Sequence, residues 1–266
     1  MLSSRHVRTG EIRAALRTIE REHGVRMVIA AESGSRAWGF PSPDSDWDVR
    51  FVYARPAEWF IALEPSRDVI EYPAFGGDPL LDICGWDMRK ALNLALRGNA
   101  ALREWLASPI VYAEAPEISG ALRDVLALAP DLDATMGYYA SLTRRMHDAC
   151  LKGPEVNLKK YLYALRPALC LRWLRDRAEL PPMDLPSLRA VATGPGEAGM
   201  LDDLLARKAA ASELGVGPRL AVADALIGEM LGWASAHAPP SPGQRVRVNE
   251  AALALLRRSA AWASAA

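Results

Sequence analysis

The sequence predicts an α+β fold in which a mixed sheet with helices is followed by an all-α C-terminal region. Two observations support this class. Short apolar runs bounded by Gly, Pro, Asp or Ser are typical of strands and occur before residue 113. Beyond that point, nearly every segment has the apolar spacing of amphipathic helices. We therefore expect the pattern to change near residues 113–118, with one domain at 1–115 and a second at 116–266.

The first domain contains the predicted strands. A helix is expected from Thr9 to His23, where Gly24 ends an amphipathic pattern. Apolar runs further along predict strands at 25–31, 47–54, 67–73, 79–84 and 110–112. Helical spacing predicts helices at 57–63, 86–97 and 100–107.

The second domain is predicted to be helical throughout. Its helices are expected at 116–128, 132–151, 156–178, 186–192, 199–213, 217–238 and 248–264. Gly and Pro interrupt helices, and the expected breaks fall at Gly153-Pro154, Pro181-Pro182, Gly194-Pro195-Gly196 and Pro239-Pro240.

Composition indicates a globular protein without a general affinity for nucleic acid. Half of the 266 residues are hydrophobic (50%), which is enough for a sizeable core. Basic and acidic residues are equal in number, so the formal net charge is zero. General nucleic-acid-binding proteins carry a strong basic field instead, so any RNA contact must be local.

The cysteines, histidines and hydrophobic runs argue against a disulfide-rich, zinc-binding or membrane protein. Cys84, Cys150 and Cys170 are widely spaced in apolar surroundings and are expected to be reduced core thiols. The four histidines are scattered and form no zinc-binding pattern. The sequence has no N-terminal hydrophobic signal and no apolar run of about 18 residues. We therefore expect a soluble, cytoplasmic protein without a membrane segment.

Two aspartates stand at the start of the predicted strand 47–54. Because side chains alternate across a strand, Asp46 and Asp48 should share one face. Asp82 is the only charge in the apolar run 79–84 and can reach the same face from a neighbouring strand. Grouped carboxylates are costly unless cations neutralise them, and Mg²⁺ prefers such oxygen ligands. We therefore predict these three acids as catalytic ligands of two Mg²⁺ ions, with Mn²⁺ as the alternative ion.

A Gly-Ser turn follows the predicted strand 25–31. Gly34 permits a tight turn, and Ser35 can present its hydroxyl and nearby N–H groups to phosphate oxygens. Arg36 can contact a phosphate or remain an exposed turn residue, and Glu32 can tune the metal site or pair with Arg36 at the surface. Taken alone, a Gly-Ser turn or an Asp-x-Asp pair is usually ordinary loop chemistry, so their joint order is the stronger signal.

That order resembles the DNA polymerase β-like nucleotidyltransferase superfamily: strand, Gly-Ser, Asp-x-Asp-strand, then apolar-Asp-apolar. A closer resemblance is to the predicted nucleotidyltransferases associated with RNA-repair pathways in bacteria and phages. The segments that carry it are Glu32–Gly39, Gly85–Leu92, Gly98-Asn99, Glu104–Pro109 and Lys159–Pro167.

The resemblance implies a polymerase β palm-like catalytic domain and a helical domain that closes over nucleotide and substrate. It implies transfer of a nucleoside monophosphate from a nucleoside triphosphate, ATP among them, to an acceptor hydroxyl with release of pyrophosphate. The resemblance favours an RNA or tRNA end as the acceptor. A protein hydroxyl and a small molecule such as an aminoglycoside are the alternative acceptors. The alternative function is a nucleotide-sensing or RNA-binding module without turnover. The oligomeric state stays open.

A local basic excess lies in the second domain. Nine Lys or Arg residues and three acids occur between residues 141 and 177. Composition alone favours a solvated helix face, but Lys159, Tyr163 and Arg166 are spaced to share one face. The resemblance to the family's Lys-Tyr-Arg helix favours nucleotide binding by these residues and Lys160. Which of the two lysines points inward is left open.

Overall fold

The computed structural model describes residues 2–63, 67–128, 131–151, 153–210, 215–237 and 245–265, without the side chains of residues 2–6, 150 and 245–247. The expected break at Pro239-Pro240, the ends of the expected helices 199–213 and 217–238, and the thiol of Cys150 lie outside the described residues. Within these ranges, a mixed sheet with helices is joined to a helical region, which confirms the predicted α+β fold.

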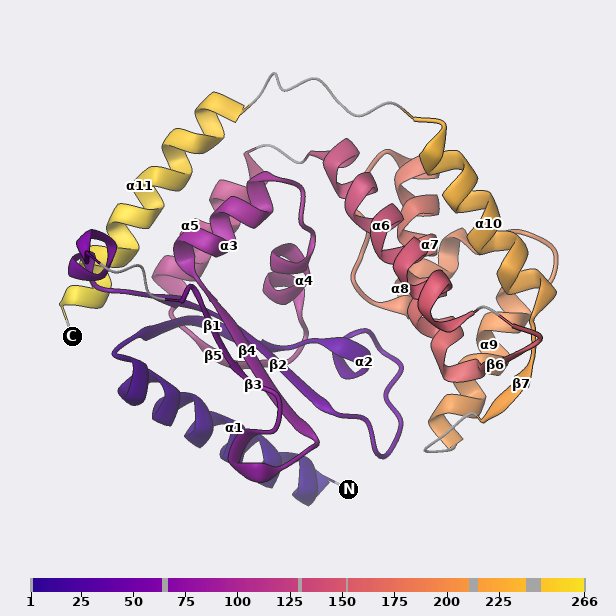
Figure 1. Cartoon of the computed structure of the whole chain (residues 1–266), viewed down its shortest axis with the longest axis horizontal. Coiled ribbons are helices and arrows are strands. Elements are labelled where there is room, and N and C mark those ends of the chain that lie inside the picture. The colour runs from indigo at the N-terminus through magenta and orange to yellow at the C-terminus, as the bar shows by residue number, and fades with distance from the viewer. Residues whose placement is uncertain are drawn as a thin grey trace.

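Five strands form the mixed sheet in the order β3-β4-β2-β1-β5 (Figure 1). β2 and β4 are parallel, whereas the other neighbouring pairs are antiparallel. Each strand overlaps a predicted apolar run: β1 (Arg26–Glu32), β2 (Trp47–Ala54), β3 (Val69–Tyr72), β4 (Leu81–Asp87) and β5 (Val111–Glu114).

The end of β4 differs from the prediction for a local reason. The strand continues to Asp87 instead of ending at residue 84. Asp87 is the N-cap of α3 (Met88–Leu96), where its Oδ1 accepts the N–H of Lys90 at 2.6 Å. An N-cap residue has extended backbone geometry, so the same residue can end the strand and begin the helix.

Helices cover both faces of the sheet, because apolar side chains alternate along its strands. α1 (Leu2–His23) begins earlier than the expected Thr9 and packs on one face against Val49, Phe51 and Ile83. α3, α4 (Ala101–Ala107), α5 (Pro116–Ala127) and α11 (Arg245–Ser264) pack on the other face. Figure 1 shows α1 on one side of the sheet and α3, α5 and α11 on the other.

The chain returns to the sheet at α11. Val248, Ala252 and Leu255 of this helix are buried in the same core as Val28 and Val52 of the sheet. α5 contributes to that core as well. The change in sequence pattern near residue 115 therefore does not coincide with the division between the cores.

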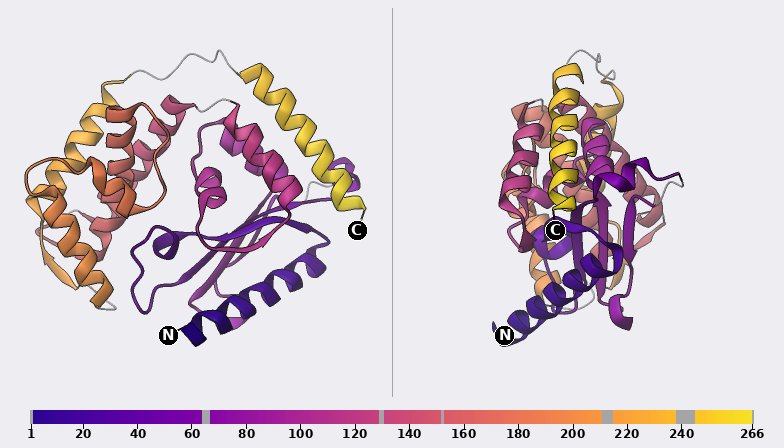
Figure 2. Two further views of the ribbon diagram at one scale, coloured as in Figure 1. Left: turned by 180° about the vertical axis from the view of Figure 1, so that it is seen from behind. Right: turned by 90° about the vertical axis from the view of Figure 1, so that its left-hand side faces the viewer.

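The remaining helices form a second core around α7 (Leu158–Arg177), which is buried along most of its length. They are α6 (Leu132–Cys150), α8 (Leu185–Leu188), α9 (Glu197–Ala210) and α10 (Ala221–Ser235). We call this group, α6 to α10, the helical lobe. The left view of Figure 2 shows it beside the sheet.

Shorter elements complete the described chain. Two strands that the sequence did not predict, β6 (Glu155–Asn157) and β7 (Val216–Pro218), pair antiparallel beside α7. At three residues each, they are too short to show an alternating pattern. The 3₁₀ turns are η1 (Ala57–Ile61), where a helix at 57–63 was expected, η2 (Phe75–Gly77) and η3 (Arg189–Val191).

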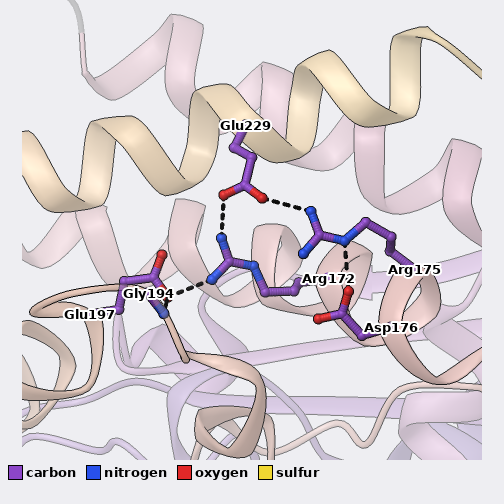
Figure 3. Close-up of polar contacts among 6 residues, drawn as sticks. All are labelled: Arg172, Arg175, Asp176, Gly194, Glu197 and Glu229. Carbon is purple, nitrogen blue, oxygen red and sulfur yellow. Dashed lines mark hydrogen bonds and ion pairs between the residues drawn. The ribbon is translucent and has the colours of Figure 1, made fainter.

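Charged side chains tie the helices of the helical lobe together (Figure 3). Arg172 of α7 donates to Glu197 of α9 and to Glu229 of α10, both at 2.5 Å. Glu229 also accepts from Arg175 at 2.6 Å, and Arg175 donates to the neighbouring Asp176. The network joins three helices that are separate in the sequence.

Candidate active site

The acids predicted on neighbouring strands are brought together by the sheet. β2 and β4 run parallel, and their register places Asp48 directly beside Asp82. Matched positions on neighbouring strands direct their side chains to the same face. The two side chains expose 29% and 36% of their surfaces. A ligand from solvent can therefore reach this pair.

Arg50 joins the two carboxylates. It lies two residues after Asp48 on β2 and shares its face of the sheet. Its Nη2 atom is 3.2 Å from Oδ1 of Asp48 and 2.7 Å from Oδ2 of Asp82. Its Nη1 atom donates to the carbonyl oxygen of Asp82 at 3.3 Å. One guanidinium thus partly offsets the charge of two acids.

Burial and neighbouring charges affect Asp48. Burial raises the pKa of Asp48 above its ordinary value, and the charges of Asp82 and Asp46 add to this rise. Arg50 and Arg36 act in the opposite direction because they favour the charged form. A further cation beside this carboxylate would lower its pKa and stabilise the charged form.

Asp46 is less closely associated with the pair. It precedes β2, and its side chain is exposed. Among the described residues, no group of three or more His, Cys, Asp or Glu side chains is gathered in a way that could hold a metal ion. The chemistry of Asp48 and Asp82 nevertheless fits a hard divalent cation, since Arg50 already places positive charge between their oxygens. The structure thus brings together two of the three predicted acids.

Gly34 is tied to the acid pair. It begins α2 (Gly34–Ala37) directly after β1 and has a φ of 59°, a region that favours glycine. A Cβ atom at this position would lie 1.9 Å from Oδ2 of Asp48. The N–H of Ser33 donates to the carbonyl oxygen of Asp48 at 2.8 Å. A larger residue at position 34 would displace the carboxylate, so the Gly-Ser turn and the acid pair form one site.

Ser35 is buried in a cluster of hydroxyl groups. Its Oγ donates to Oγ of Ser45 at 3.0 Å, and Oγ of Ser45 lies 2.9 Å from Oγ of Ser42. Lys208 of α9 reaches the same cluster, with its Nζ 3.4 Å from Oγ of Ser42. The Ser35 hydroxyl therefore holds the loop that leads to Asp46, and its contact with phosphate stays a prediction.

Arg36 fastens the same loop from the other side. Its Nε donates to the carbonyl oxygen of Asp46 at 3.0 Å, and its Nη2 donates to that of Ser45 at 2.5 Å. Its guanidinium carbon lies 3.9 Å from the centre of the Trp47 ring. These contacts fix the backbone immediately before β2.

Glu32 supports Asp48 from the interior. It is fully buried at the end of β1, so the exposed pair with Arg36 that the sequence allowed is excluded. Its Oε1 accepts the N–H of Asp48 at 2.9 Å, and its Oε2 accepts the hydroxyl of Tyr112. Burial raises the pKa of Glu32 to about 7. A buried carboxyl group thus holds the peptide of a predicted metal ligand.

Arg166, which the sequence predicts as a triphosphate ligand, is buried. Its Nη2 atom lies 2.7 Å from Oε1 of Glu104 on α4, and only 2% and 10% of the two side chains are exposed. Glu104 also accepts from the hydroxyl of Tyr139 at 2.8 Å and from Nε1 of Trp38 at 3.3 Å. The pair therefore connects the helical lobe to the segment that follows α2.

The other predicted residues of α7 lie near that segment. Tyr163 packs edge-on against Trp38 and Phe40, with ring centres 6.0 and 5.9 Å away. Lys160 is exposed, with its Nζ 5.9 Å from the Tyr163 ring, whereas Lys159 is half-buried. The start of α7 thus contacts the chain between the Gly-Ser turn and the acids, but none of these contacts reaches Asp48 or Asp82.

Sequence reasoning missed Arg50 and Lys208 as parts of the site and its supports, and it did not identify Arg166 as the partner of Glu104. A signal existed for Arg50, because strand alternation places it on the same face as Asp48. Glu104 follows Arg103 in α4, whose other residues are apolar. Lys208 lies far away in the sequence, and no local pattern connects it to Ser42.

One described cavity lies away from the acids. It has a volume of about 520 Å³ and lies against the charged network of Figure 3, next to Arg172, Glu197 and Glu229. None of the predicted site residues lines it.

In the described part of the chain, no helix is sufficiently long and apolar to cross a membrane.

Comparison with known proteins agrees with this geometry. A profile described as the RNA repair pathway DNA polymerase beta family matches residues 9–258. The chain is also 43% identical over 208 residues to the "Uncharacterized protein YcgL" of Bacillus subtilis (strain 168), covering 78% of this chain and 79% of that protein. The profile match spans both the sheet and the helical lobe. This chain therefore belongs to the RNA repair pathway DNA polymerase beta family.

Proposed function

We propose that this protein is a nucleotidyltransferase that transfers a nucleoside monophosphate from a nucleoside triphosphate to an acceptor hydroxyl and releases pyrophosphate. The observation that carries this proposal is the pairing of Asp48 with Asp82 next to Gly34. Acids paired in this way suit divalent cations, which phosphoryl transfer commonly requires. Membership of a DNA polymerase beta family supports the same reaction class.

Asp48 and Asp82 would hold the divalent cations, Mg²⁺ or Mn²⁺, with Asp46 as a third ligand. When bound, two such ions would stabilise charge on the attacking and leaving oxygens. Arg50 orients the two carboxylates towards each other, and Glu32 holds the Asp48 peptide. These contacts keep the acids in place before a substrate arrives.

The Gly-Ser turn would bind the triphosphate. The absence of a side chain on Gly34 lets the backbone approach the acids closely, which is where the α-phosphate would have to lie. Ser35 and Arg36 hold the loop that carries Asp46. They would therefore keep the distance between the Gly-Ser turn and the acids constant.

The start of α7 would contribute cations to the outer phosphates. Lys160 is exposed and Lys159 half-buried, and both lie one helical turn from Tyr163. Arg166 would act indirectly, because its buried pair with Glu104 holds Trp38 between the helical lobe and the Gly-Ser turn.

The acceptor we propose is an RNA end, since the family is described by its place in RNA repair. The test is to incubate the protein with each nucleoside triphosphate labelled at the α-phosphate, Mg²⁺ and total RNA, protein or an aminoglycoside. We expect label on RNA, and none with Asp48→Asn or Asp82→Asn. Label on protein or on the aminoglycoside would retain the reaction and change the acceptor.

A nucleotide-sensing module without turnover is the second candidate. The observation in its favour is that the described residues contain no three-acid metal group, while Arg50 occupies the space between two of the acids. Tight triphosphate binding without label transfer to any acceptor would support this candidate and contradict the enzyme.

A further inference from the structure

The guanidinium of Arg50 is bound entirely by the residues around the acid pair. Besides its contacts with Oδ1 of Asp48 and Oδ2 of Asp82, it donates to the carbonyl oxygens of Asp82 at 3.3 Å and of Val49 at 3.1 Å. A single nitrogen, Nη2, is shared by both carboxylates. Arg50 thus occupies the place between the two carboxylates.

A divalent cation would need the same oxygens. Each carboxylate oxygen has more than one lone pair, but two positive charges at about 4 Å repel each other strongly when partly shielded from water. The guanidinium and a metal ion therefore cannot both remain between Asp48 and Asp82 at low cost.

Arg50 is also placed where it can leave. Its side chain is 20% exposed, and the carboxylates are more exposed still. Ion pairs that solvent can reach are more easily exchanged than fully buried ones, and a long side chain can change rotamer without disturbing the core. The exchange of one cation for another is thus compatible with the fold.

A bound triphosphate favours the metal ion over Arg50 at the two acids. Its negative charge holds metal ions, and its oxygens give a displaced guanidinium a new partner, since Arg binds phosphate with paired hydrogen bonds. We propose that Arg50 is an internal counter-cation, displaced from Asp48 and Asp82 when divalent metal and triphosphate bind together, so that metal alone binds weakly. This inference rests on the proposed function, in which these acids hold the metal.

The test is direct measurement of Mn²⁺ binding to the full chain by electron paramagnetic resonance, with and without a non-hydrolysable triphosphate. In the Arg50→Gln variant, we expect Mn²⁺ alone to bind more tightly by about tenfold or more. The triphosphate analogue should increase Mn²⁺ affinity strongly in the wild type and much less in the variant. Thermal unfolding in EDTA gives a second readout, because the variant leaves the two acids unneutralised and should show a lower Tm that Mn²⁺ restores.

Matched variants separate the alternatives. Arg189 forms an exposed pair with Asp202 at 2.7 and 2.5 Å, away from the acids, so Arg189→Gln should leave Mn²⁺ binding unchanged. Arg50→Lys keeps a cation without the shared nitrogen and should raise Mn²⁺ affinity by less than the Gln variant does. It also serves as the test if Arg50→Gln does not fold.

The outcomes are distinct. If Mn²⁺ binds the Arg50 variants no more tightly than the wild type, the counter-cation role is overturned while the metal site remains. If wild-type protein binds no Mn²⁺ even with the triphosphate analogue, or if Asp48→Asn and Asp82→Asn do not weaken its binding, the proposed function fails.

Discussion

Arg50 and Arg166 are both paired with carboxylates, yet Arg50 lies on the inner strand β2 where solvent can reach it, and Arg166 lies in the interior between α4 and α7. Arg50 and its acids are 20% to 36% exposed, whereas the Arg166 and Glu104 side chains are 2% and 10% exposed. Loss of one partner from a buried pair leaves an uncompensated charge, while an exposed partner is replaced by water. Burial, and not the type of residue, therefore decides which arginine is a fixed support and which can exchange.

The largest effect is expected at the exposed acids and on activity. Asp48→Asn or Asp82→Asn should each reduce label transfer by about 1,000-fold or more, because an amide is a poor ligand for a divalent cation. Their Tm should remain near that of the wild type, since both side chains are partly exposed. Asp202→Asn is the matched control and should stay active. An active Asp82→Asn protein would remove Asp82 from the metal site.

The next effect is expected at the buried pair and on stability. Arg166→Met should lower the free energy of unfolding by about 3–5 kcal/mol, since Glu104 would remain buried without its partner. Denaturant unfolding measures this change. Adding Glu104→Gln to the same chain should recover part of the loss, and a double-mutant cycle gives the coupling.

Arg166→Met also separates two roles for this residue. A stable variant with greatly weakened triphosphate binding would show that Arg166 is a ligand after all, as its position in the sequence suggested. The exposed Arg189→Met control should change stability by no more than about 1 kcal/mol.

A smaller effect is expected for the hydroxyl cluster. Ser35→Ala removes the donor to Ser45 and should lower stability by about 1 kcal/mol, with a comparable loss of triphosphate affinity because the loop before Asp46 is loosened. Calorimetry measures both quantities. Ser45→Ala should behave in the same way, and loss of triphosphate affinity with an unchanged Tm would instead indicate direct phosphate contact by Ser35.

The smallest effect concerns two thiols that report on the two arginines. Cys84 is opposite Arg50 in the sheet and half-buried, whereas Cys170 is fully buried beside Arg166. Burial raises the pKa of both thiols, that of Cys170 to about 12. In a Cys150→Ser background at pH 8, a thiol reagent should modify Cys84 first.

The pH dependence provides the check on this last prediction. Thiolate is the reactive form, so the reactivity of Cys170 should keep rising with pH up to about 12. Equal rates for the two thiols at pH 8 would mean that the interior around Arg166 opens readily, contrary to the comparison.

The sequence predicted the strands well because their apolar runs are short and bounded by turn residues. It also predicted that Asp48 and Asp82 could meet, since strand alternation fixes which side chains share a face. It could not predict the pairing of Arg166 with Glu104, because periodicity shows that a helix has a buried face without showing what packs against it. The same limit applies to α11, whose pattern predicted a helix but not its place on the sheet.

Expression of residues 1–115 alone would remove both α5 and α11 from the sheet. The buried face formed by Val28, Ile29 and Val52 would then meet water, and such an apolar surface favours aggregation. A fragment that keeps the acids and this core would need the end of α5 joined to the start of α11, with the helical lobe excised between them. The sheet and its covering helices are thus discontinuous in the sequence, and the helical lobe is an insertion within them.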